Sequence, residues 1–121
     1  MNELVGIIRR AEEVQQALDA LVKLRDRVTR LSVEGHRQYN PGWHLAIDLH
    51  NMLRVSECVA RAALERTESR GGHTRDDYPA TDPEWGKVNL ILEETDGQIR
   101  LFKQDLPQMP DELKSFFDGG K

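Results

Sequence analysis

Hydrophobic residues recur at steps of three and four through the first third of the chain. They are Val14, Ala17, Leu18, Leu21, Leu24, Val28 and Leu31. This spacing places them in one stripe along an α-helix, and the largely charged residues between them fit its solvated face. The stretch 33–39, VEGHRQY, breaks the pattern at Gly35 and is predicted to be a loop.

A second, longer helix is predicted from Asn40 to about Ser69. Asn40 is suited to cap the first turn, and Pro41 to take the first helical position, where its missing N–H costs nothing. Gly71 and Gly72 are predicted to end the helix, because glycine readily adopts the left-handed conformation found at helix ends.

The second helix is apolar on two sides. One series comprises Ala46, Leu49, Leu53, Ser56, Ala60 and Ala63, and the other comprises Ile47, Val55, Cys58 and Ala62. A helix with two apolar sides is expected to lie between two neighbours. Since the chain offers only one other full-length helix, a further packing partner is expected.

After Pro79 the pattern becomes that of β-structure. The segments KVNLIL and QIRLFK flank EETDG, and Asp96-Gly97 is a favoured dipeptide for a tight hairpin turn. A short β-hairpin is therefore predicted. In the tail, Leu113, Phe116 and Phe117 are placed to form one apolar patch on a last helical turn or two. We expect a helical part, 1–79, and a hairpin with its tail, 80–121, within the same domain.

Composition narrows the class of protein. The chain has 121 residues, 38% hydrophobic and 31% charged, which suits one helical domain with a modest core. A net charge of −4 argues against nucleic acid as a partner. No apolar run approaches the roughly 18 residues that span a bilayer, and the N-terminus lacks a signal-peptide pattern. Cys58 is alone, so no internal disulfide is expected.

The residues that could carry chemistry lack the usual settings for it. His44 and Asp48 stand four apart and could share a helix face, but His50 points to a different side of the helix, so a metal site is not favoured. The serines lack a G-x-S-x-G context, and no Gly-rich loop follows a strand and opens a helix. We therefore predict no catalytic, cofactor-binding or metal-binding residue in this chain.

The segment ESRGGHTRDDYP, 68–79, has the highest density of charge. Arg70, His73 and Arg75 could converge on an anion, since arginine offers a rigid fork of donors that suits a carboxylate. The alternative is that the charges pair among themselves or with a neighbouring surface and fix a chain reversal; these residues are Glu68, Arg70, Asp76 and Asp77. Spacing favours the second interpretation and leaves both open.

Residues 40–79, followed by Trp85 and Lys87, resemble the C-terminal domain of the flavoprotein subunit of succinate dehydrogenase and fumarate reductase, to which L-aspartate oxidase is related. The signature is E-S-R-G-x-H-x-R-x-D-Y-P, carried here by Glu68, Ser69, Arg70, Gly71, His73, Arg75, Asp77, Tyr78 and Pro79. Gly72 replaces a common alanine, and Val88 stands where a histidine often follows, which leaves the subclass open. The hairpin favours succinate dehydrogenase or fumarate reductase over aspartate oxidase.

The resemblance implies a mainly α fold, a spectrin-repeat-like three-helix bundle followed by a short β-hairpin and a C-terminal tail. In the family the first helix of the bundle comes from sequence ahead of VGIIR. Residues 2–9 are then expected to be the end of a truncated first helix, and the whole chain a fragment of a larger flavoprotein. The isolated chain is expected to self-associate through the face that the missing helix would cover.

The resemblance also implies a function. The family oxidises succinate to fumarate through FAD and passes electrons to an iron–sulfur subunit and then to quinone in the membrane. Its FAD-binding and catalytic residues lie upstream, so this chain is expected to bind no FAD and to be inactive alone. The complex is expected in the cytoplasm, held at the inner face of the membrane by anchor subunits.

The same resemblance gives the signature residues a docking role. Contacts with the FAD-binding domain or the iron–sulfur subunit are expected from Glu68, Ser69, Arg70, His73, Arg75, Asp77 and Tyr78. The alternatives are the C-terminal domain of fumarate reductase or L-aspartate oxidase, and a free-standing, non-enzymatic helical interaction module.

Overall fold

Two antiparallel helices and a β-hairpin beside them make up most of the computed structural model, which describes residues 1–118. The helices are α1 (Ala11–Val28) and α2 (Pro41–Glu65), and the hairpin strands are β3 (Val88–Thr95) and β4 (Gln98–Asp105). Shorter elements are β1 (Ile8–Arg9), β2 (Thr74–Arg75), the 3-10 turn η1 (Trp85–Lys87) and α3 (Asp111–Asp118). The mainly α class with a short hairpin and a C-terminal tail is confirmed.

Helix α1 forms on the predicted stripe. Acidic Glu12 and Glu13 lie in its first turn and basic Arg25 and Arg27 in its last, which complements the helix dipole. Its buried residues are Val14, Ala17, Leu21 and Val28, all members of the predicted stripe. The hydrophobic period therefore located both the helix and its inward side.

Helix α2 begins as predicted and ends earlier. The Asn40 side chain accepts a hydrogen bond from the Gly42 N–H at 2.9 Å, and Pro41 is the first helical residue. The helix stops at Glu65 and not at about Ser69, and Gly71, with φ of 57°, lies in the tight turn between Arg70 and His73. The predicted glycine closure is wrong, because a side chain from further along the chain closes this helix instead.

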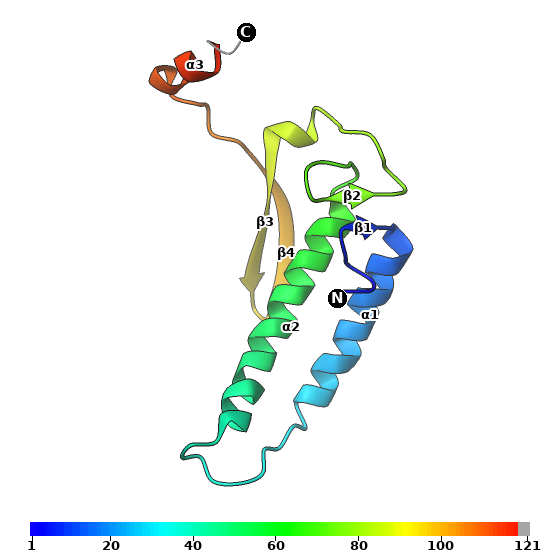
Figure 1. Cartoon of the computed structure of the whole chain (residues 1–121), viewed down its shortest axis with the longest axis vertical. Helices are drawn as coiled ribbons and strands as arrows, with labels where there is room; N and C mark the ends of the chain where they lie inside the picture. Colours follow the sequence, from blue (N-terminus) through cyan, green and yellow to red (C-terminus); the bar gives the residue numbers. More distant parts are fainter. Residues whose placement is uncertain (119–121) are drawn as a thin grey trace.

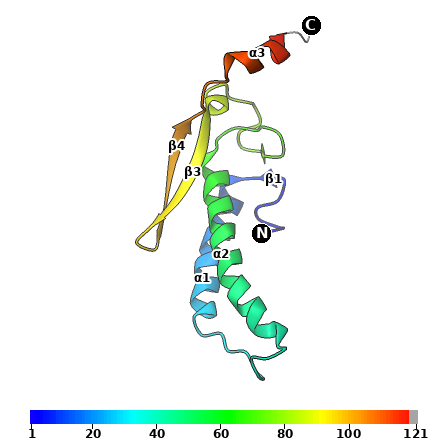
Figure 2. The ribbon, with the colours of Figure 1, turned by 90° about the vertical axis from the view of Figure 1, so that its left-hand side faces the viewer.

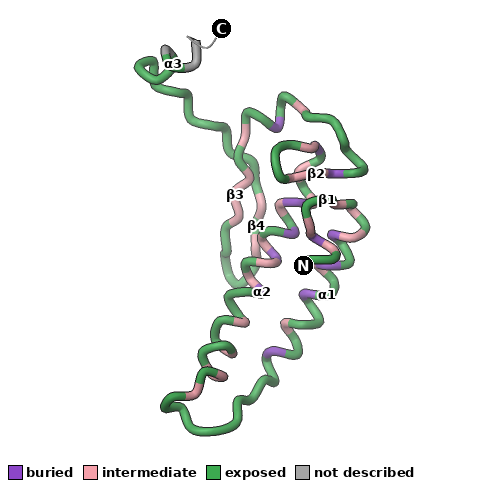
Figure 3. The backbone as a smooth tube through the Cα atoms, in the orientation of Figure 1, coloured by how far each residue is buried: buried purple, intermediate pink, exposed green. Residues whose placement is uncertain are grey.

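The core is a narrow seam between the two helices. One buried cluster contains Val5, Val14, Ala17, Ala60 and Ala63, and the other contains Leu21, Val28 and Leu53. Figure 3 shows the buried positions of both helices on their facing sides. Three of the eight are alanines, so the two backbones can approach closely along the seam.

The segment ahead of α1 is not the end of a helix, which corrects the prediction for residues 2–9. It contains one i→i−4 bond, from the Val5 N–H to the Met1 carbonyl at 2.8 Å, and then extends into β1. Strand β1 pairs in parallel with β2, placing Ile8 opposite Thr74 and Arg9 opposite Arg75. The loop that contains β2 supplies backbone hydrogen-bond partners, and the core buries Val5. The segment is therefore more stable extended than helical.

The β-hairpin lies along α2 on a different side from the N-terminal segment (Figure 2). Asp96 and Gly97 both have positive φ, 53° and 76°, at the turn between Thr95 and Gln98, and the predicted hairpin is confirmed. The hairpin supplies α2 with its second neighbour, and Arg54 of α2 pairs with Glu94 of β3 at 2.9 Å.

Parts of α2 and of the tail remain uncovered. Leu45, Met52 and Val55 of α2 are between 61% and 68% exposed. Helix α3 stands beyond the hairpin on an extended linker, with Phe116 79% exposed (Figure 1). The Phe117 side chain lies outside the described residues.

Within 1–118, no helix combines the length and the apolar character needed to cross a membrane. The assignment of 1–79 and 80–121 to one domain stays a prediction.

Candidate functional site

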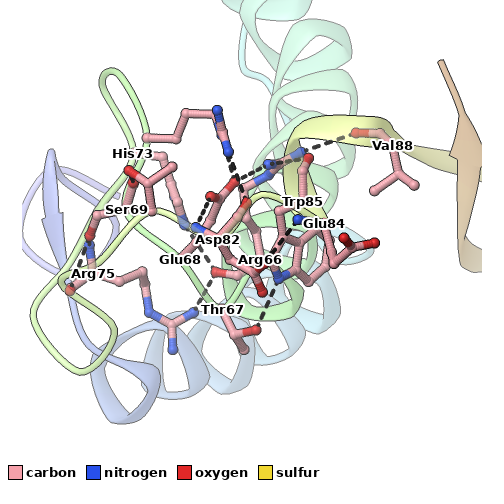
Figure 4. A network of polar contacts seen from close by, with 12 residues as sticks. Arg66, Thr67, Glu68, Ser69, His73, Arg75, Asp82, Glu84, Trp85 and Val88 are labelled. Carbon is pink, nitrogen blue, oxygen red and sulfur yellow. Dashed lines mark hydrogen bonds and ion pairs between the residues drawn. The ribbon is translucent and has the colours of Figure 1, made fainter.

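The signature residues lie in a loop that wraps the C-terminal end of α2 (Figure 4). Arg75 is the centre of this loop and is only 1% exposed. Its Nη1 donates to the carbonyl oxygens of Ala63 at 2.9 Å, Leu64 at 3.0 Å and Arg66 at 3.2 Å. The last carbonyls of a helix have no partner within it, so the Arg75 side chain is the cap that closes α2.

Arg75 also forms a two-point pair with Asp77. Its Nε donates to Oδ1 at 2.7 Å and its Nη2 to Oδ2 at 2.6 Å. The second oxygen of Asp77 accepts from the Ala11 N–H at 3.1 Å, at the first residue of α1. The Arg75 hydrogen bonds lower the pKa of Asp77 to about 2, so the carboxylate keeps its charge at neutral pH. One ion pair thus joins the start of α1 to the end of α2.

Glu68 is the second fixed charge of the loop and is fully buried. Its Oε1 accepts from Arg66 Nη1 at 2.5 Å and from Arg70 Nε at 2.9 Å, and its Oε2 accepts from the Asp82 N–H at 2.9 Å. The hydrogen bond from Arg70 is the largest cause that lowers the pKa of Glu68 to about 2. Glu68 therefore holds the returning chain at Asp82 against the end of α2.

His73 connects the loop to the N-terminal segment. Its Nδ1 lies 2.6 Å from Arg9 Nη1, and its Nε2 lies 3.1 Å from the Arg66 carbonyl oxygen. A guanidinium can only donate and a carbonyl can only accept, so these partners require a neutral ring with its proton on Nε2. Burial, and after it the charges of Arg9 and Arg75, lower the pKa of His73 against the opposing hydrogen bond to Arg66.

The remaining signature residues complete the same loop. Ser69 Oγ accepts from the Arg75 N–H at 2.8 Å and donates to the Tyr78 carbonyl at 2.9 Å. Arg70 Nη2 donates to the Asp82 carbonyl at 2.9 Å, and the Tyr78 ring lies 5.0 Å from the Arg75 guanidinium. All seven predicted residues are brought together, and Arg70, Asp77 and Tyr78 reach the surface.

The structure adds residues that sequence reasoning did not assign to this site. Trp85 is 7% exposed, and its ring centroid lies 5.1 Å from the Arg66 guanidinium and 3.8 Å from the Lys103 ammonium. Its Nε1 donates to Thr67 Oγ1 at 3.2 Å. Trp85 was part of the resemblance, but Lys103 and Arg9 come from distant segments and carried no local signal.

The arrangement suits a structural role better than a reaction. The loop carboxylates are paired within the chain, Asp76 with Arg10 at 2.9 Å in addition to the pairs above, which supports internal pairing over an anion site. Among residues 1–118, every buried side-chain nitrogen or oxygen has a partner, and no three His, Cys, Asp or Glu residues are placed to hold a metal ion.

The fold and the loop define a small helical domain, in which the start of α1 and the end of α2 are joined by the Arg75–Asp77 pair and a β-hairpin lies on the flank of α2. Residues 1–113 match the family model described as fumarate reductase flavoprotein C-term. The chain therefore belongs to the family of C-terminal domains of succinate dehydrogenase and fumarate reductase flavoproteins.

Individual relatives agree with this family. Sdh1 of Mycobacterium smegmatis, solved in complex with UQ1, is 53% identical, covers 96% of this chain and superposes with a TM-score of 0.80; the chain spans 20% of it. The E. coli quinol fumarate reductase is 30% identical over 91% of the chain, again with a TM-score of 0.80 and 20% of its own length. The succinate dehydrogenase flavoprotein subunit of Coxiella burnetii is 37% identical over 101 residues, 82% of this chain and 17% of that protein.

Proposed function

We propose that this chain serves as the C-terminal docking domain of a succinate dehydrogenase flavoprotein and performs no catalysis by itself. The observation that supports this role is the Arg75–Asp77 pair, which uses the most buried cation of the signature to hold helix ends together. Such a group is committed to structure and is not free to bind or protonate a substrate.

In the whole flavoprotein, FAD supplies the redox chemistry by taking a hydride from succinate, and the protein positions flavin and substrate. The residues for that work belong to other parts of the polypeptide in this proposal. Electrons pass onward to an iron–sulfur subunit and to quinone, and the complex sits at the cytoplasmic face of the membrane through its anchor subunits. The relative solved in complex with UQ1 supports a quinone as the final acceptor.

The proposed docking edge is the exposed part of the signature loop. Arg70 has 42% of its side chain exposed and Tyr78 is 44% exposed, while the Asp77 side chain is 31% exposed. These three offer a cation, an anion and an aromatic ring to the FAD-binding domain or the iron–sulfur subunit. Glu68, Ser69, His73 and Arg75 would support the edge from beneath by fixing the loop.

The test uses the full-length flavoprotein with Arg70→Ala or Arg75→Ala. We expect both variants to lose bound FAD during gel filtration and to recover less iron–sulfur subunit in co-purification. Arg30→Ala is the matched control, because Arg30 pairs only with Asp26 on the surface of the described chain and both side chains are 71% exposed. Wild-type FAD content and wild-type assembly in both loop variants would contradict the docking role.

Fumarate reduction is the second candidate, since two curated relatives, one named for each direction, match the chain at similar identity. The E. coli fumarate reductase flavoprotein subunit is 34% identical over 110 residues, close to the value for the Coxiella succinate dehydrogenase. Rates of succinate oxidation and fumarate reduction by the full-length enzyme, measured with one redox dye, distinguish the two. A faster fumarate reduction would reverse the assignment.

A further inference from the structure

We propose that His73 is a pH-sensitive latch, in which the neutral ring holds Arg9 and a protonated ring releases the N-terminal strand β1 from the signature loop. The inference does not depend on the proposed docking function. It rests on how the ring is bonded, on which charges surround it, and on how little else holds β1.

The two ring nitrogens have partners that tolerate only one protonation state. Arg9 Nη1 approaches Nδ1 at 2.6 Å, and the Arg66 carbonyl approaches Nε2 at 3.1 Å. Nδ1 must therefore accept and Nε2 must donate. A second proton on Nδ1 would replace the acceptor with a donor, so the hydrogen bond to Arg9 would be lost.

The charges that act on the ring add to this preference. Arg9 of β1, Arg66 after α2 and Arg75 of β2 each lower its pKa, so cations face it from three segments. The carboxylates of the loop do not offset them, because Glu68 is bound by Arg66 and Arg70, and Asp77 by Arg75. An imidazolium here would meet Arg9 at contact distance with no carboxylate of its own.

Strand β1 has few other attachments to the loop. The ladder with β2 is two residues long, with backbone bonds from Thr74 N–H to the Ile7 carbonyl at 3.2 Å and from Asp76 N–H to the Arg9 carbonyl at 3.0 Å. Ile8 is 63% exposed, and the Arg10–Asp76 pair lies at the surface. Such a short ladder is expected to open locally without unfolding the helices.

The direction of the pH effect follows from proton linkage. The closed latch binds a proton on His73 less well than the open latch, where the ring has its ordinary pKa of 6.5. The latch is therefore closed above that pH and loosens as pH falls below it. The opening equilibrium should rise by up to about tenfold per pH unit until the pKa of the closed form is reached.

Amide hydrogen exchange on the 121-residue chain tests the latch. The Thr74 and Asp76 amides, whose acceptors belong to residues 7 and 9, should lose up to about fivefold in protection factor between pH 6.5 and 5.5, after correction for intrinsic exchange. The Leu106 amide, bound to the Lys87 carbonyl at the far end of the hairpin, should keep its protection.

Two variants assign the effect to His73. His73→Gln can still donate to the Arg66 carbonyl and accept from Arg9 but cannot titrate, so protection at Thr74 and Asp76 should become independent of pH. His50→Gln, at an exposed position of α2, should keep the wild-type pH dependence. The proposal is overturned by a wild-type protein without pH dependence or by a His73→Gln protein that retains it.

Titration of the His73 ring in the wild-type protein tests the latch without any variant. Ring ¹⁵N shifts of the wild-type protein should show the proton on Nε2 and a pKa of His73 below 6.5. A proton on Nδ1, or a pKa at or above the ordinary value, would overturn the latch.

Discussion

Arg75 and Asp77 form a two-point ion pair in which one carboxylate serves both ends of the helical hairpin. The guanidinium closes α2 by donating to the Ala63 and Leu64 carbonyls, while Asp77 caps α1 at the Ala11 N–H. Both helix ends therefore depend on two side chains that stand two positions apart. The signature loop therefore connects the start of α1 to the end of α2.

Arg75→Lys should lower the free energy of unfolding by about 1–3 kcal/mol, since it leaves carbonyl groups at the end of α2 and part of the Asp77 carboxylate without donors. Lysine keeps the charge but cannot donate to Asp77 and to three carbonyls from one rigid fork. Urea unfolding followed by circular dichroism measures the loss. Arg30→Lys at the exposed pair with Asp26 is the control and should cost less than about 1 kcal/mol; an equal cost at both sites would refute the role of Arg75.

Stability should decline in acid through Glu68 and Asp77. The pKa of each is lowered to about 2 in the folded chain, from 4.5 and 3.8 respectively. Because the unfolded chain binds these protons more readily, their contribution is complete above about pH 4.5 and is lost as pH falls toward 2.

A Glu68→Gln, Asp77→Asn double variant should therefore be less stable at neutral pH and show a flatter acid dependence of its urea midpoint. Glu84→Gln, which alters an exposed pair with Lys87, should leave the slope of the wild type. An unchanged slope in the double variant would assign acid sensitivity to other groups.

Glu57 of α2 links the two helices by an ion pair further along their length. Its side chain is 9% exposed and pairs with Arg25 of α1 and with Arg61 of its own helix. Glu57→Ala should lower the free energy of unfolding by about 1–3 kcal/mol, because it leaves Arg25 and Arg61 without the carboxylate that they share. Asp26→Asn, at a pair exposed on both sides, should change it by less than about 1 kcal/mol in the same thermal or urea melt.

The uncovered side of α2 should make the isolated chain self-associate. Leu45, Met52 and Val59 are spaced by seven positions and are 68%, 62% and 43% exposed, so they form one apolar stripe. Sedimentation velocity should show a mass that rises with concentration. Met52→Lys should return the chain to a monomer, whereas Lys23→Glu on α1 should not; a monomeric wild type at all concentrations would remove this surface from consideration.

Local sequence signals were sufficient for most elements of the fold. The three-and-four spacing determined α1 and its buried side, Asn40-Pro41 determined where α2 begins, and Asp96-Gly97 determined the hairpin turn. Each of these signals acts within a few residues, because helix periodicity, capping and turn conformation depend on near neighbours. The signature likewise identified the residues that gather in the loop.

Only the tertiary structure decided how distant segments complete one another. The end of α2 at Glu65 depends on Arg75, and β1 exists because the loop after α2 supplies its hydrogen-bond partners. Lys103 of β4 likewise contacts the Trp85 ring only because the hairpin folds back beside it. These contacts join residues far apart in sequence, so their energies appear only when the chain has folded back on itself. By itself the sequence determined α1, the start of α2 and the β-hairpin, whereas packing determined that β1 forms, where α2 ends and what holds its loop.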